Sequence, residues 1–222
     1  MSNTITSVVF DMDGLILDTE TLWYDSVLLT NKYHHTNVPM DLIHECIGLR
    51  NPDIDKKLKS VMGEDFDTDK FRELNRFYMN KEITENGLKV KKGFFELFEY
   101  LKKNNIKTAV ASSSFIEKIK EKLAAANIDI NIFDYVIGGD MVKESKPDPE
   151  IYLKACSVLC EKAESVIALE DSNNGIISAY NAGLKAILIP DVVKNSDYVR
   201  SIAYKELHNL SEVIDIIEKL NN

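Results

Sequence analysis

Residues 6–20, TSVVFDMDGLILDTE, combine a short apolar run with two acids that follow it directly. The apolar part, residues 6–10, is typical of a buried β-strand. Asp11 and Asp13 then place two carboxylates at the end of that strand. Burial destabilises a carboxylate unless it is paired, hydrogen-bonded or bound to a metal. The stretch therefore predicts a core strand that leads directly into a polar site.

The composition allows a sizeable core and limits the classes of partner. Of the 222 residues, 45% are apolar and 28% are charged, which predicts one large domain or a core domain with an insertion. The net charge of −9 argues against a nucleic-acid-binding protein, because such proteins normally present a basic face. No apolar run approaches the roughly 18–20 residues of a membrane span. Residues 1–7 show no export signal. The chain has three cysteines, a number that fits a reducing compartment. We expect a cytoplasmic monomer that binds neither nucleic acid nor membranes.

The pattern of apolar residues divides the chain into two kinds of segment. Between residues 18 and 88 the pattern is that of amphipathic helices, whereas beyond it short apolar runs alternate with helical stretches. We expect strands at residues 106–112 (IKTAVAS), 135–139 (YVIGG), 165–171 (SVIALED) and 185–190 (KAILIP). Such alternation implies a parallel sheet with helices on both faces. The predicted fold is an α/β, Rossmann-like core of residues 1–17 and 89–222, with an all-helical insertion at 18–88.

Polar residues follow three of the expected strands and should meet at one edge of the sheet. Ligands of open parallel sheets bind beyond the carboxyl ends of the strands. Those ends carry Asp11 and Asp13, then Ser112 with two further serines, then Glu170 and Asp171, while Lys146 precedes a helix at the same edge.

This set of side chains points to phosphate chemistry. Acids this close repel one another unless a cation holds them, and oxygen ligands without histidine or cysteine suit Mg²⁺. A serine hydroxyl near a helix start and the ammonium of Lys146 both suit an anion. A metal, an anion site and a nucleophilic carboxylate together predict phosphoryl transfer through an aspartyl phosphate.

Four motifs in order resemble those of the haloacid dehalogenase superfamily, and more narrowly its β-phosphoglucomutase-like branch of sugar-phosphate phosphatases and mutases. They are DMDGLILD (residues 11–18), Ser112, SKPDPEIY (145–152) and LEDSNNG (169–175). The resemblance covers essentially the whole chain and implies that residues 18–88 form a helical cap domain that opens and closes over a catalytic core. It implies that Asp11 is the nucleophile and Asp13 the general acid and later the base. Ser112, Ser113 and Lys146 would hold the phosphoryl oxygens.

The same resemblance implies a metal site and one substrate contact. Mg²⁺ would be bound by the side chain of Asp11, the backbone carbonyl of Asp13 and Asp171, with Glu170 bound directly or through water. Arg50, in a Gly-Leu-Arg turn of the insertion, would contact the substrate; the alternative is an ordinary solvated arginine.

The resemblance implies a Mg²⁺-dependent phosphatase that acts on a small phosphorylated sugar or related metabolite. The alternative enzyme is a β-phosphoglucomutase that interconverts β-glucose 1-phosphate and glucose 6-phosphate. The Lys-Asn pair expected of such mutases is not found in residues 73–83 (ELNRFYMNKEI), which favours hydrolysis. A catalytically idle metabolite-binding protein is a third hypothesis, disfavoured because every motif residue is present.

Plain structural explanations exist for several of these residues. Asp11 and Asp13 could mark a turn, and Asp171 could cap the helix that begins near Asn173. Ser112 to Ser114 could cap the helix that follows them, a role that we expect beside phosphate binding. Each explanation is reasonable for one motif alone, but four motifs in order favour the catalytic interpretation.

Overall fold

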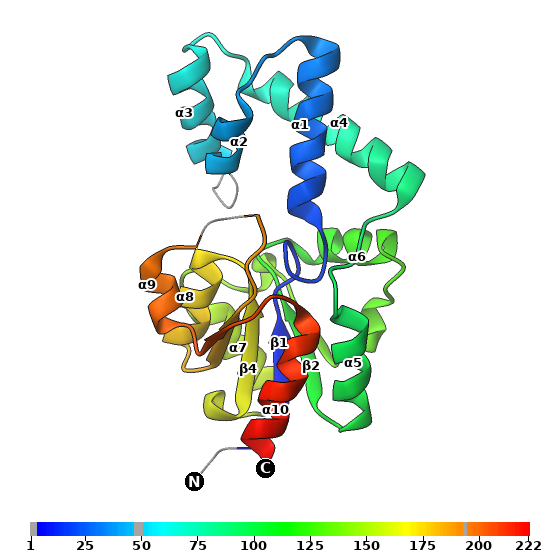
Figure 1. The fold of residues 1–222 in the computed structure, drawn as a ribbon, viewed down its shortest axis with the longest axis vertical. Helices are drawn as coiled ribbons and strands as arrows, with labels where there is room; N and C mark the ends of the chain where they lie inside the picture. The colour runs from blue at the N-terminus through cyan, green and yellow to red at the C-terminus, as the bar shows by residue number, and fades with distance from the viewer. Residues whose placement is uncertain (1–3, 47–50, 193–194) are drawn as a thin grey trace. The chain divides into compact units, whose positions relative to one another are not determined.

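The computed structural model describes residues 4–46, 51–192 and 195–222. The chain forms two compact units, Met1–Asp18 with Lys89–Asn222 and Thr19–Leu88 (Figure 1). None of the helices in the described part of the chain is long and apolar enough to cross a membrane.

The first unit is built on a six-stranded parallel sheet. Its strands are β1 (Ser7–Phe10), β2 (Lys107–Ala111), β3 (Tyr135–Ile137), β4 (Val166–Glu170), β5 (Lys185–Leu188) and β6 (Lys205–Glu206), in the order β3-β2-β1-β4-β5-β6. Every residue of β1 is buried, because β1 lies between β2 and β4 near the centre of the sheet. The predicted α/β parallel-sheet fold is confirmed. Strand β6 was not predicted, since its two residues are exposed and carry no apolar signal.

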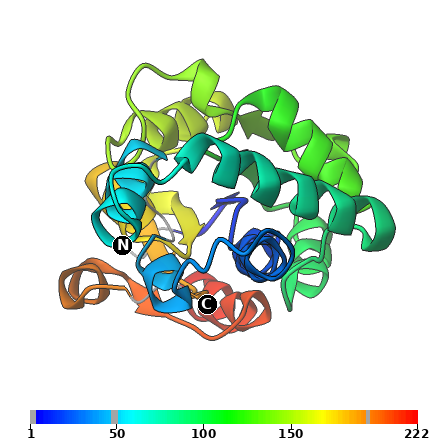
Figure 2. The same ribbon diagram turned by 90° about the horizontal axis from the view of Figure 1, so that it is seen from above.

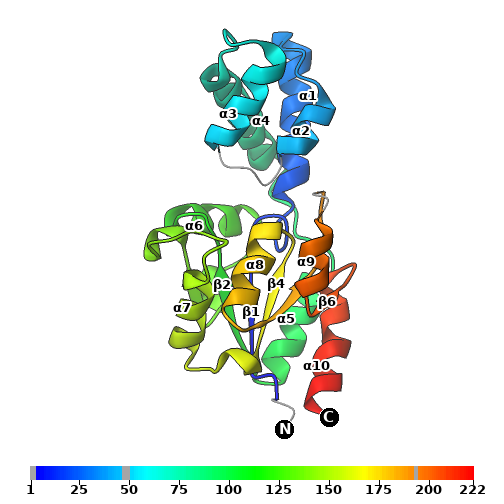
Figure 3. The ribbon, with the colours of Figure 1, turned by 90° about the vertical axis from the view of Figure 1, so that its left-hand side faces the viewer.

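Helices cover both faces of this sheet, as Figure 3 shows. Helices α7 (Glu150–Leu159) and α8 (Asn173–Asn181) lie on one face, and α5 (Phe94–Lys103) and α10 (Val213–Asn221) lie on the other. Val9 packs in the core under α7 and α8. Its neighbour Phe10 points the opposite way, with its ring centroid 5.9 Å from that of Phe94 on α5. Burial on both faces explains why the strands read as continuous apolar runs. Two further α-helices of this unit, α6 (Ile116–Ala125) and α9 (Asp197–Ile202), lie within the described residues.

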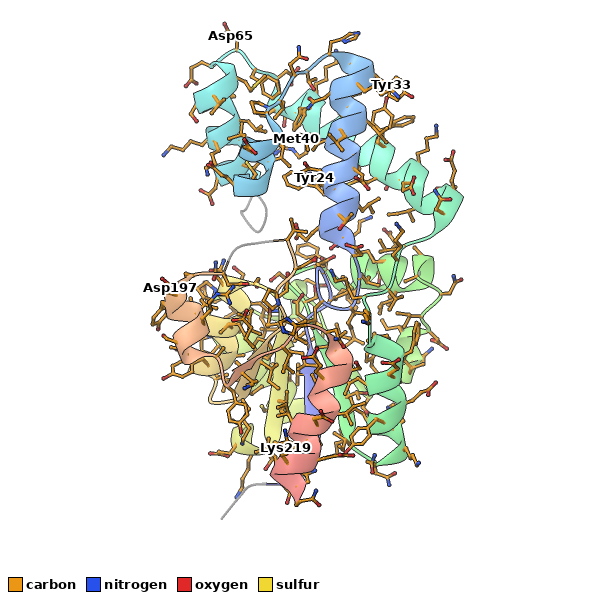
Figure 4. All side chains as sticks on the ribbon, viewed as in Figure 1. Tyr24, Tyr33, Met40, Asp65, Asp197 and Lys219 are labelled. Atoms are coloured by element: carbon orange, nitrogen blue, oxygen red, sulfur yellow. The ribbon has the colours of Figure 1, made fainter. Side chains whose placement is uncertain are left out.

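The second unit consists of helices α1 (Thr19–His34), α2 (Met40–Cys46), α3 (Asn51–Met62) and α4 (Thr68–Asn86). Figure 2, which looks along α1, shows α4 passing beside it. The buried Thr30 hydroxyl on α1 donates to Oδ1 of Asn75 on α4 at 2.6 Å. Tyr24 and Met40 lie against the apolar core of this unit, whereas Tyr33 points away from it (Figure 4).

The chain leaves and re-enters the first unit through two segments that lie side by side. The backbone N–H of Asp18 donates to the carbonyl oxygen of Lys89 at 3.0 Å, and the backbone N–H of Lys91 donates to the carbonyl oxygen of Ile16 at 2.8 Å. The turn that carries Asp11 and Asp13 is thereby connected to the start of the α5 segment.

Candidate active site

Three buried carboxylates meet where β1 and β4 end. The two strands pair in register with Phe10 opposite Leu169, so the residues that follow, Asp11 and Glu170, are brought together. One oxygen each of Asp11, Glu170 and Asp171 lies within 4.8 Å of the others, and all three side chains are buried. Sequence reasoning therefore identified a group of acids that the structure does bring together.

Lys146 is the cation that joins this group. Its Nζ donates to Oδ1 of Asp11 and to Oε1 of Glu170, both at 2.6 Å, and to the carbonyl oxygen of Ala111 at 2.9 Å. These three acceptors use all three ammonium protons. With only 5% of its side chain exposed, Lys146 is fixed at the carboxyl ends of β1, β2 and β4.

The charges of this cluster are far from balanced by Lys146 alone. Burial raises the pKa of Asp11 to about 7; Lys146 opposes this shift, whereas Glu170 adds to it. Burial lowers the pKa of Lys146, but the carboxylates of Asp11 and Glu170 outweigh it, so the pKa lies above its usual value and the ammonium stays charged. Three carboxylates against one ammonium, with only oxygen donors, fit a hard divalent cation such as Mg²⁺.

Two glycines allow the backbone to approach these acids closely. Gly14 has φ +81°, and a Cβ at this position would lie 2.3 Å from Oδ2 of Asp171. Gly175, in the first turn of α8, would place a Cβ 1.9 Å from the carboxylate of Glu170. A side chain at either position would displace a member of the cluster.

Ser172, rather than Asp171, caps α8. The Ser172 hydroxyl accepts from the N–H of Gly175 and donates to Oε2 of Glu170, both at 3.1 Å. The structural explanation of Asp171 as the helix cap is therefore wrong. The side chain of Asp171 belongs to the acidic group instead.

Asp13 lies beside this group but its side chain has different partners. Ser114 donates from Oγ to Oδ2 of Asp13 at 3.0 Å, and Lys122 donates from Nζ to Oδ1 at 2.7 Å. Both donors come from the segment after β2, since Lys122 lies on α6. The carboxylate of Asp13 is 28% exposed, and it therefore stays in contact with solvent.

The serines after β2 do not cap α6. This helix begins at Ile116, whose N–H donates to Oδ1 of Asp140 at 3.0 Å. Ser112 is buried, and its Oγ accepts instead from the N–H of Ser114 at 3.1 Å. Ser113, between them, is exposed. The expectation that Ser112 to Ser114 cap α6 is therefore wrong. Arg50, the predicted substrate contact, lies outside the described residues.

Two residues of this site were missed from the sequence. The Tyr152 hydroxyl donates to Oε1 of Glu170 at 2.6 Å, and the Tyr152 ring centroid lies 5.1 Å from Nζ of Lys146. A tyrosine on the buried face of α7 was a usable signal, because a buried hydroxyl normally requires a partner. Lys122 gave no such signal, since α6 carries other lysines at two-residue spacing.

The family model of haloacid dehalogenase-like hydrolases matches residues 8–189, a span that includes all three buried acids and Lys146. The chain belongs to this family. The predicted resemblance to the haloacid dehalogenase superfamily is thus confirmed.

Individual members of this family resemble the chain along most of its length. A phosphorylated carbohydrates phosphatase of Thermotoga maritima is 30% identical over 182 residues, which are 82% of this chain and 83% of that protein. The pyrophosphatase PpaX of Bacillus mycoides is 26% identical over 98% of this chain and 99% of its own. A Thermotoga maritima crystal structure, provisionally named a β-phosphoglucomutase, has a TM-score of 0.80 and 25% identity, covering 97% of this chain and 99% of that one. The predicted family branch, the β-phosphoglucomutase-like one, is confirmed. The predicted enzyme class, a haloacid dehalogenase-type phosphatase, is also confirmed. The mutase alternative is not favoured.

Proposed function

We propose that this enzyme hydrolyses the phosphate monoester of a small phosphorylated sugar or related metabolite, with Asp11 as the nucleophile. The observation that carries the proposal is the contact between Nζ of Lys146 and Oδ1 of Asp11 inside a buried cluster of acids. The relative named for phosphorylated carbohydrates supports the substrate class.

In the first step the carboxylate of Asp11 attacks phosphorus, and the bond between phosphorus and the sugar oxygen breaks. Asp13 gives a proton to that oxygen, so the product leaves as an alcohol. In the second step water attacks the phosphorus of the aspartyl phosphate while Asp13 takes a proton from it. Inorganic phosphate then leaves and Asp11 is regenerated.

The surrounding residues supply charge and position. Lys146 neutralises the nucleophile before the attack. It contacts the transferred group, together with Ser112 and Ser113, by releasing one of its three protein acceptors. Positioned positive charge of this kind provides much of the catalysis in phosphoryl transfer.

Mg²⁺ would be held by the side chains of Asp11 and Asp171 and by the backbone carbonyl of Asp13, and would supply further positive charge at the phosphoryl oxygens. Glu170 already accepts from Lys146 and Tyr152 on Oε1 and from Ser172 on Oε2. One lone pair of Oε2 is left for the ion or for a water bound to it.

The proposal also includes a cytoplasmic location and a monomeric state. The free cysteines Cys46, Cys156 and Cys160 support a cytoplasmic location, because unpaired thiols are typical of reducing compartments. A monomeric state would be tested by the mass of the protein in solution.

A panel of sugar phosphates assayed with Mg²⁺ tests the proposal, and Asp11→Asn is the decisive variant. We expect phosphate release from at least one member and a loss of at least about a thousandfold in kcat for the variant, with unchanged circular dichroism. Full activity of Asp11→Asn would exclude the covalent route. Glucose 1-phosphate in the panel, with a bisphosphate primer, would reveal a mutase by glucose 6-phosphate formed without phosphate release.

A further inference from the structure

We propose that Lys122 is a positioning residue that fixes the carboxylate of Asp13 for proton transfer. The inference rests on the proposed acid–base role of Asp13. It concerns a residue on α6 that belongs to none of the four sequence motifs.

Asp13, Lys122 and Ser114 form a closed triangle of polar contacts. Lys122 Nζ lies 2.7 Å from Oδ1 of Asp13 and 3.4 Å from Oγ of Ser114, and Ser114 Oγ lies 3.0 Å from Oδ2 of Asp13. Each carboxylate oxygen thus has its own donor. A carboxylate held on both oxygens has one rotamer available to it, which is what a proton donor aimed at a single leaving oxygen requires.

A contribution to stability does not account for this ion pair. The side chains of Lys122 and Asp13 are 31% and 28% exposed. Pairs with this much solvent access contribute little to folding. Geometry at Asp13 is the larger consequence of the contact.

Helix α6 also supplies a matched control. Lys118 pairs with Glu121 and Lys120 pairs with Glu117, each three residues away on the same helix, and these lysine side chains are 64% and 50% exposed. Lys118→Met therefore removes the same charge from the same helix without touching Asp13.

The test uses aryl and alkyl phosphates whose leaving alcohols differ in acidity, from p-nitrophenyl phosphate to the best sugar phosphate of the panel. kcat/KM reports the step in which the alcohol leaves, so its dependence on leaving-group pKa measures protonation by Asp13. We expect Lys122→Met to lose about tenfold more kcat/KM on the least acidic alcohol than on p-nitrophenyl phosphate. Lys118→Met should follow the wild-type dependence. Lys122→Gln, which keeps an N–H donor, should fall between the two and serves if Lys122→Met folds poorly.

The outcomes separate the inference from the proposed function. If both Lys122 variants lose activity equally on all substrates, or lose none, Lys122 does not position Asp13. Asp13→Asn, measured in parallel, should show the steepest dependence on the leaving group. If Asp13→Asn shows no such dependence, the acid role itself fails, whatever Lys122 does.

Discussion

Replacing Tyr152 by phenylalanine tests the buried network around Glu170 with little change in shape. The Tyr152 hydroxyl, fully buried, donates to Oε1 of Glu170 at 2.6 Å. Burial and the neighbouring carboxylate of Glu170 raise the pKa of Tyr152 well above its usual value, so the phenol keeps its proton and remains a donor. Phenylalanine keeps the ring that faces Lys146 and removes only this hydrogen bond.

The size of the effect follows from the charge of the acceptor. A hydrogen bond to a charged group contributes about 1.5–3 kcal/mol. Since Lys146 still donates to the same oxygen of Glu170, no acceptor is left without a partner and the loss should stay within that range. In a chain of this length each kcal/mol corresponds to about 2–4 °C in Tm, so we expect Tm to fall by about 3–12 °C.

Thermal unfolding followed by circular dichroism in metal-free buffer is the assay. Tyr198→Phe is the control, because Tyr198 lies on α9 and is 59% exposed, so its hydroxyl can be replaced with little change in Tm. If the Tm of Tyr152→Phe equals that of Tyr198→Phe, the contact between Tyr152 and Glu170 adds no stability and the prediction fails.

Three further predictions follow from the same cluster. Gly14→Ala should destabilise the fold by about 1–3 kcal/mol and lower kcat, because its backbone is left-handed and its Cβ would collide with Asp171; denaturant titration and kinetics measure both. Mg²⁺ at about 100 times its Kd should raise the unfolding free energy of the wild type by about 2.7 kcal/mol. The same Mg²⁺ concentration should raise the unfolding free energy of Asp171→Asn much less, and thermal shifts measure both. The pKa of Asp11 is raised from 3.8 to about 7. Between these two pH values the carboxyl of Asp11 is protonated in the folded metal-free protein and ionised in the unfolded chain. The unfolding free energy of the wild type should therefore fall as pH rises from 3.8 to about 7, relative to Asp11→Asn. Parallel pH dependences of the two proteins would contradict this assignment.

The acidic site could be predicted from the sequence because its determinants are local. A buried strand followed by an acid, repeated at residues 6–11 and 165–171, places both acids at one edge of any parallel sheet. Register then brings Asp11 and Glu170 together without further information from side chains. The same logic identified Lys146, since it precedes a helix, α7, that begins at the same edge.

What the sequence did not reveal depends on the rotation and start of individual helices. The sequence pattern of α6 does not distinguish among its lysines Lys118, Lys120 and Lys122. Only the direction of α6 in space brings Lys122 into contact with Asp13. The start of α6 at Ile116, beyond the three serines, is set by a distant acceptor, Asp140, rather than by a local cap. Long-range contacts of this kind leave no periodic signal.

Rapid acid quench of the enzyme during turnover, followed by peptide mass spectrometry, shows directly whether Asp11 is the nucleophile. We expect a phosphoryl group on Asp11 that appears within one turnover and disappears when substrate is exhausted. Phosphate released at the full rate with no phosphoryl group on Asp11, or with that group on another residue, would contradict this expectation.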